Sequence, residues 1–177
     1  RRFKGVGRPE PPSKEQTVTI DGQITEWEQV KPFYSTPPGN TLHRNHPGWS
    51  GIQFTNNTGR NDFVSTRVAR DKDNLYFLVQ TAESITSHTD PGWMWLFLNT
   101  DRKRNTGWEG YDYMLNRTSP SSTTITIERN KGDWKWEKCG EATYKISGKQ
   151  MEIKIPRALL SLKDQKLNFE FKWTDNI

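Results

Sequence analysis

Hydrophobic and polar side chains alternate along much of this chain with a period of two residues, as in β-strands whose two faces meet different surroundings. The last such stretch, 167–173, is the clearest, because Leu, Phe, Phe and Trp share one face while Asn, Glu and Lys share the other. Two stretches, 74–82 and 93–98, are apolar on both faces, which indicates strands buried on both sides. Shorter alternating stretches lie at 62–70, 111–115, 125–127, 134–136, 144–146 and 151–155.

These stretches and the turn signals between them recur about ten times after Thr17, a spacing that favours an antiparallel all-β fold. Helical signals are few. Residues 24–30 offer one or two amphipathic turns around Trp27, and Pro156 suits the first position of a short helix. The sequence therefore predicts an all-β protein, an antiparallel β-sandwich of about ten strands with one or two short helices.

Two segments interrupt the strand pattern. Residues 1–16 hold three prolines and no periodic apolar positions, so they predict a basic, proline-rich arm or linker before a sandwich that spans 17–177. Residues 31–62 are rich in proline, glycine and asparagine and carry Trp49. A loop of this length inside a domain is usually functional or disordered, and its tryptophan and its paired histidines, His43 and His46, favour a partly ordered loop.

Composition and charge narrow the class of protein. A chain of 177 residues has the length of one domain, and its 8 Trp, 8 Phe and 5 Tyr argue against disorder. The net charge is +5, but residues 1–16 hold five basic and two acidic side chains, so most of the excess lies in the predicted arm. This leaves no basic stripe for nucleic acid. No apolar run approaches the roughly 18 residues of a membrane helix. We therefore expect neither nucleic acid nor a membrane as a partner.

Residues with catalytic chemistry are present without a catalytic pattern. The single cysteine, Cys139, has no histidine near it in sequence, and the G-x-S-x-G motif of serine hydrolases is absent. Carboxylates lie near predicted strand ends, but their spacing selects no pair for glycoside hydrolysis. We therefore expect a protein that is not an enzyme.

The segment 99–113 is a polar connection between two predicted strands. It is rich in oxygen ligands of the kind that calcium takes, and Asn99, Asp101 and Asp112 are the candidate ligands. The alternative is a hairpin loop in which Asn, Asp and Gly serve only the geometry of the turns.

Aromatic residues at strand ends and in loops suggest a second kind of site. The flat C–H face of a sugar packs on an indole ring, while its hydroxyl groups need fixed polar partners. The candidate sugar contacts are Trp49, Trp93, Trp108 and Tyr111, with Glu83 and Arg117 as polar partners. The alternative for each tryptophan is packing in the core.

The order of several short motifs resembles family 9 carbohydrate-binding modules. In chain order the motifs are 18–22 (VTIDG) followed by Trp27, 71–79 (DKDNLYFLV), 96–101 (LFLNTD), 151–156 (MEIKIP) and 167–171 (LNFEF). The resemblance covers the chain from Thr17 onward except for the long loop. It implies a β-sandwich attached to a polysaccharide-handling protein, an extracellular or periplasmic location, and often structural calcium. Related DOMON domains bind sugar or haem.

The resemblance also implies where a sugar would bind. In these modules two tryptophans clamp a terminal sugar, and a carboxylate and an arginine on neighbouring strands hold its hydroxyl groups. Trp95 stands in the place of that carboxylate and Met114 in the place of that arginine, so the family's site is not repeated residue by residue.

Three functions follow as hypotheses. The first is a non-catalytic carbohydrate-binding module, whose partners are an oligo- or polysaccharide and an attached catalytic domain. The second is a structural domain that packs on a neighbouring catalytic domain through the apolar Trp95 and Met114. The third is haem binding of the DOMON type, with Met94 or Met114 and a histidine as axial ligands.

Overall fold

A computed structural model describes residues 10–39, 44–48 and 51–176. In these residues there are eleven strands: β1 (Phe33–Ser35), β2 (Arg44–Pro47), β3 (Gln53–Asn56), β4 (Phe63–Arg70), β5 (Asn74–Thr81), β6 (Trp95–Asn99), β7 (Tyr113–Leu115), β8 (Thr124–Asn130), β9 (Trp136–Ser147), β10 (Gln150–Pro156) and β11 (Glu170–Thr174). Two single 3-10 turns, η1 (Thr25–Trp27) and η3 (Arg157–Leu160), are the helical elements of the described residues. The predicted antiparallel all-β fold is confirmed.

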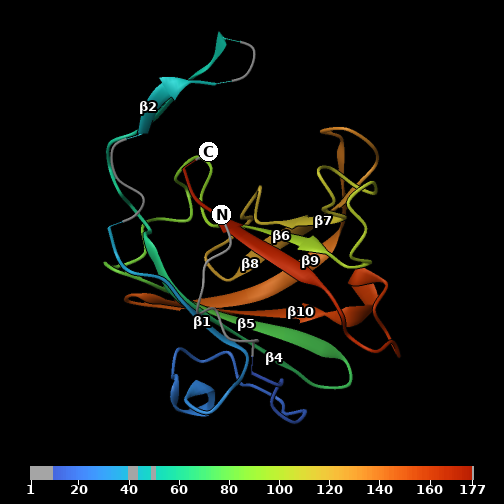
Figure 1. The fold of residues 1–177 in the computed structure, drawn as a ribbon. Coiled ribbons are helices and arrows are strands. Elements are labelled where there is room, and N and C mark those ends of the chain that lie inside the picture. The colour runs from blue at the N-terminus through green and yellow to red at the C-terminus, as the bar shows by residue number, and fades with distance from the viewer. Residues whose placement is uncertain (1–9, 40–43, 49–50, 177) are drawn as a thin grey trace.

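Nine strands form one antiparallel sheet in the order β1-β4-β5-β10-β9-β8-β7-β6-β11. The sheet curls until its two halves face each other, so that β11 lies over β5 (Figure 1). Where β11 faces β1 and β5, side chains and not strand pairing make the contact. The ring centroids of Phe77 and Phe171 are 5.3 Å apart, and those of Tyr34 and Phe171 are 5.5 Å apart. The curl therefore makes the two layers of a sandwich from a single sheet.

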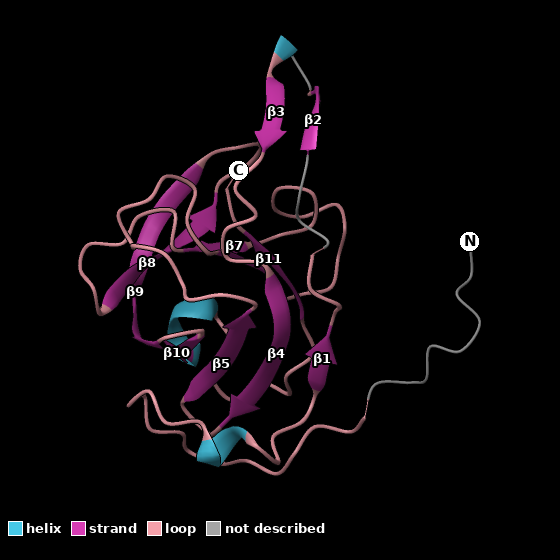
Figure 2. Ribbon diagram, turned by 90° about the vertical axis from the view of Figure 1, so that its left-hand side faces the viewer, coloured by secondary structure: helices cyan, strands magenta, loops and turns pink. Residues whose placement is uncertain are grey.

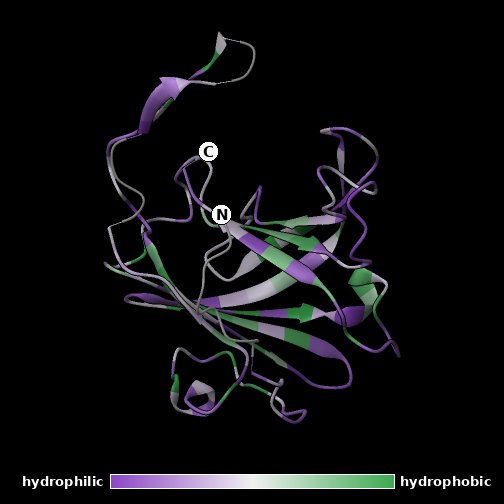
Figure 3. Ribbon diagram, viewed as in Figure 1, coloured by the Kyte–Doolittle hydropathy of each residue, from purple (hydrophilic) through white to green (hydrophobic). Residues whose placement is uncertain are grey.

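The core fills the inside of this curl. Alternating residues of the strands point into it, as the sequence predicts, and Leu75, Phe77 and Val79 on β5 are fully buried there. Figure 3 shows the corresponding alternation of hydrophobic and hydrophilic positions along the main strands. Phe171 and Trp173 on β11 pack against the same core, which places Glu170, Lys172 and Thr174 on its outer side.

The outer face of one half of the sheet is covered by the N-terminal part of the chain. Val18, Trp27 and Val30 pack on Tyr76 and Leu78 of β5, and Figure 1 shows this segment beneath β4 and β5. Residues 10–16, the described part of the predicted arm, also touch the body, since the backbone N–H of Gln16 donates to the carbonyl of Arg70 at 2.9 Å.

Strands β2 and β3 form a separate hairpin that projects from the body (Figure 2). Its two strands are almost entirely exposed. The hairpin lies in the segment 31–62, which the sequence predicts to be a long, partly ordered loop, and Trp49 lies outside the described residues.

Candidate functional site

The other half of the sheet carries a cluster of aromatic rings on its outer face. We call this cluster the outer aromatic surface; it consists of Trp95, Phe97, Trp108, Tyr111, Trp134 and Trp136. Phe97 lies at its base, 1% exposed, beside the fully buried Met114 on β7. Neither residue belongs to the core inside the curl. The sheet therefore has a second apolar layer here, made by side chains instead of by a covering segment.

Register and loop geometry bring these rings together. Alternation on β6 sends Leu96 and Leu98 into the core, which leaves Trp95 and Phe97 on the outer face. The loop between β6 and β7 returns Trp108 and Tyr111 to Phe97, with ring centroids 5.5 and 5.4 Å away.

A tight turn in this loop depends on one glycine. Trp108 and Tyr111 form an isolated bridge, and Gly107 before them has a φ of +63°. A Cβ atom on Gly107 would overlap the carbonyl of Tyr111, so only glycine fits.

Trp134 is the most exposed ring of the surface. Its side chain comes from the turn between β8 and β9 and remains 44% exposed. Its centroid lies 4.6 Å from that of Trp108 in an edge-to-face arrangement, and Trp136 meets it at 84°. The other rings hold Trp134 in place from several sides, so a ligand that packs on it meets a preorganised ring.

The charged pair of Arg117 and Glu128 lies across the strand ladder from the buried Met114. Arg117 donates from Nε and Nη2 to the two carboxylate oxygens of Glu128, at 2.8 and 2.5 Å, and Glu128 is directly across from Met114. This carboxylate raises the pKa of the guanidinium above its already high ordinary value. The Arg117 side chain is 37% exposed against 7% for Glu128. Because only two of its nitrogens bind Glu128, its Nη1 group can donate to a ligand.

Charge also acts on the tyrosine of this surface. Burial raises the pKa of the Tyr111 hydroxyl, and the negative charge of Glu170 raises it further, while Arg104 opposes the shift. The hydroxyl therefore remains a neutral donor and acceptor at physiological pH.

The outer faces of the two halves of the sheet differ in the hydrogen bonding of their indole N–H groups. Under the N-terminal segment, Trp27 Nε1 donates to the buried carboxylate of Glu152 at 2.8 Å. In the outer aromatic surface, Trp95 Nε1 and Trp136 Nε1 are buried without a partner among the described residues. An unpaired buried donor is unfavourable by about 1–3 kcal/mol, and the core indoles of Trp93 and Trp173 are unpaired in the same way within the part of the chain that the structure describes.

The structure brings together two of the predicted sugar contacts, Trp108 and Tyr111, places Arg117 on Glu128 across from Met114, and separates the others. Trp93 is a correction: it is 2% exposed and packs on Tyr144 inside the curl, with ring centroids 5.8 Å apart, so it offers no face to a sugar. Asn116 holds the turn after Trp93 by donating to its carbonyl at 3.0 Å.

Glu83 follows the end of β5 and is exposed to solvent, where it pairs with Lys149 at 3.4 Å. No contact links it to the outer aromatic surface among the described residues. It is therefore not the polar partner of these rings.

The predicted calcium ligands serve the turns of their loop. Asp101 accepts from the backbone of Lys103 at 2.8 Å, and Asp112 accepts from the backbone of Thr100 at 2.8 Å. Asn99 is buried, and its amide donates to the carbonyl of Lys103. Within residues 10–39, 44–48 and 51–176, no group of three or more His, Cys, Asp or Glu side chains is placed to hold a metal ion. Calcium binding stays a prediction.

The two methionines considered for haem lie on opposite faces of the sheet. Met94 belongs to the core inside the curl and Met114 lies under the outer aromatic surface, and both are fully buried. Neither lines any of three hollows, of about 390, 430 and 530 Å³, that the described residues form.

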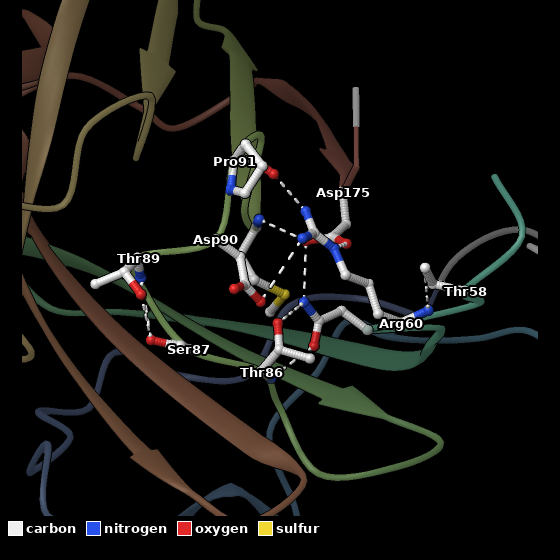
Figure 4. Close-up of polar contacts among 10 residues, drawn as sticks. Thr58, Arg60, Thr86, Ser87, Thr89, Asp90, Pro91 and Asp175 are labelled. Carbon is white, nitrogen blue, oxygen red and sulfur yellow. Dashed lines mark hydrogen bonds and ion pairs between the residues drawn. The ribbon is translucent and has the colours of Figure 1, made fainter. Parts of the chain in front are cut away.

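A polar network that the sequence did not reveal holds the end of β11 to two loops (Figure 4). Asp175 accepts from Arg60 Nε at 2.9 Å, from Asn61 Nδ2 at 3.0 Å and from the backbone of Met94 at 2.9 Å. Arg60 also donates to the carbonyl of Pro91. These residues are far apart in sequence, and no spacing or motif connects them.

Comparison of the chain with protein-family models, with curated proteins and with solved structures gives no match. Among the described residues, no helix is both long and apolar enough to cross a membrane.

Proposed function

We propose that this protein is a non-catalytic carbohydrate-binding module and that its ligand binds on the outer aromatic surface. The observation that carries the proposal is the placement of Trp134, a 44% exposed indole fixed edge-to-face by Trp108 and Trp136. Exposed indoles supply the apolar face on which a sugar ring packs, and Arg117 and Tyr111 supply polar groups for its hydroxyls.

The wider role follows from the same proposal. A binding module raises the effective concentration of an attached catalytic domain at its polysaccharide. Such a substrate lies outside the cell or in the periplasm, so we propose that location for the protein. The motif resemblance supports both the accessory role and the location.

The test is calorimetric titration of the protein and of Trp134→Ala with a panel of neutral and acidic oligosaccharides. A sugar that covers about 60 Å² of indole gains roughly 1.5 kcal/mol, so the variant should bind about tenfold more weakly. Phe33→Ala is the matched control, because Phe33 is 45% exposed on β1, away from these rings. Absence of binding to every glycan, or equal losses in both variants, would contradict the proposal.

A second candidate is a structural domain that packs on a neighbouring domain through the same surface. The unpaired indole N–H groups of Trp95 and Trp136 favour it, because an adjoining protein could cover them and supply acceptors. Acrylamide quenching separates the two functions. In a polypeptide that includes a neighbouring domain, Trp134 becomes protected if the surface is an interface and stays accessible if it binds glycan.

A further inference from the structure

The largest of the three hollows lies where the curled sheet fails to close. Its volume is about 530 Å³, within the range of small-molecule sites. β1 and β11 are the two edge strands of the sheet, and both contribute to its wall through Tyr34 and Phe171. Phe169 and the buried core residues Val68 and Leu75 also line it, so the hollow reaches the core through the seam between the edges.

Positive charge dominates the polar part of this lining. Arg70, Arg157 and Lys166 contribute three cationic groups, against the single carboxylate of Glu15. A ligand that enters an apolar hollow with this rim is favoured when it carries a negative charge.

Arg157 is the deepest of these cations, at 5% exposed. Its guanidinium donates only to backbone carbonyls, those of Asp71, Lys72, Leu162 and Gln165, and forms no ion pair with a carboxylate of the described residues. The hydrogen bonds fix its position but do not neutralise its charge. A buried charge without a counter-ion is costly, so a nearby anion would relieve that cost.

Arg70 is the cation whose guanidinium has N–H groups without a partner among the described residues. It lies at the end of β4, and one nitrogen, Nη1, donates to the carbonyl of Ser13 at 2.7 Å. The structure gives no partner for its Nε and Nη2 groups among the described residues. These groups are placed to bind a carboxylate at the mouth of the hollow.

From this combination we infer a second binding site, separate from the outer aromatic surface, for a small amphipathic anion. The apolar body of the ligand lies against Phe169 and Phe171, and its carboxylate or sulfonate lies at Arg70. Aromatic and alkyl carboxylates share this chemistry, and the aromatic lining accepts either body.

The probe is 8-anilinonaphthalene-1-sulfonate, an apolar anion whose fluorescence rises when it leaves water. It should bind the full chain at one saturable site and be displaced by laurate or by 4-phenylbutyrate, and which of the two acts identifies an alkyl or an aromatic ligand. The uncharged dodecanol should displace it at least tenfold less well. No displacement by either carboxylate, or equal displacement by dodecanol, would overturn the inference.

Arg70→Gln should weaken probe binding about tenfold, the effect of one charge-assisted hydrogen bond. Arg67→Gln is the matched control, since Arg67 on the same strand also donates Nη1 to a carbonyl, that of Val30, at 2.7 Å. An equal loss in the control would overturn the inference. If Arg70→Gln does not fold, the exposed Lys166→Gln replaces it, with a smaller loss expected and no loss contradicting the site.

One further variant separates this site from the proposed function. Trp134→Ala should leave probe binding unchanged, because Trp134 belongs to the outer face of the sheet, whereas Val68, Leu75 and Phe171 of the hollow belong to the core inside the curl. Loss of probe binding in Trp134→Ala would place the probe on the outer aromatic surface and refute a second site.

Discussion

Replacement of Asp175 by alanine removes the acceptor at the centre of the network in Figure 4. The Asp175 side chain is 4% exposed and accepts three hydrogen bonds, from Arg60, Asn61 and the backbone of Met94. In Asp175→Ala the Arg60 charge, itself only 14% exposed, loses its closest carboxylate, and two neutral donors lose an acceptor.

The expected loss of unfolding free energy follows from the burial of this ion pair. Removal of one partner from a buried ion pair is destabilising by about 3–5 kcal/mol. For a chain of this length each kcal/mol lowers Tm by about 2–4 °C, so Asp175→Ala should lower Tm by roughly 10 °C. Circular dichroism during heating, with urea unfolding as a second measure, gives the value.

The matched control is Glu83→Ala, which also removes a carboxylate from an ion pair. That pair is exposed, with Lys149 at 3.4 Å, and exposed pairs contribute little. We expect a Tm change of no more than about 2 °C. A similar fall in both variants, or a fall below about 3 °C in Asp175→Ala, would refute the reasoning that the burial of this network sets its strength.

Three further outcomes are expected. Gly107→Ala should lower both stability and glycan affinity, measured by urea unfolding and calorimetry, because its Cβ would displace the turn that carries Tyr111. Burial and Asp71 raise the pKa of Tyr76 to about 12; since the folded value is the higher one, stability should fall as pH rises from about 10 to 12, and the late part of the tyrosine titration at 295 nm should shrink in Tyr76→Phe. Burial raises the pKa of Glu152 above its ordinary 4.5, so its contribution is complete below about pH 4.5 and is lost as pH rises through the folded value. Urea midpoints should show that slope in the natural chain and not in Glu152→Gln.

Strand positions could be predicted from the sequence because burial alternates with the strand period. The stretch 93–98 is apolar on both faces, and β6 has Leu96 against the core and Phe97 under the outer aromatic surface. The curl of the sheet was not predictable in the same way. It depends on contacts such as Phe77 with Phe171, between residues almost a hundred positions apart, which no local pattern records.

The site was only partly predictable for a related reason. Trp108 and Tyr111 could be found because they end a polar loop, but the sequence marks Trp134 only as part of the alternating stretch 134–136. Only the ring contacts of Trp134 with Trp108 and Phe97 show that this face holds the other rings. The prediction that Trp93 contacts sugar is wrong because its ring points into the core. The next residue, Met94, has a φ of +51°, and Asn116, from a distant part of the chain, fixes this turn.

The central claim is that glycan binds on the outer aromatic surface, and the eight indole N–H signals of the ¹⁵N-labelled protein test it most directly. During titration with an oligosaccharide, the signals of Trp95, Trp134 and Trp136 should shift together and saturate. Trp27, hydrogen-bonded under the N-terminal segment, and Trp173, inside the curl, should stay in place. Shifts confined to Trp27 or Trp173, or no shift with any glycan, would contradict the account.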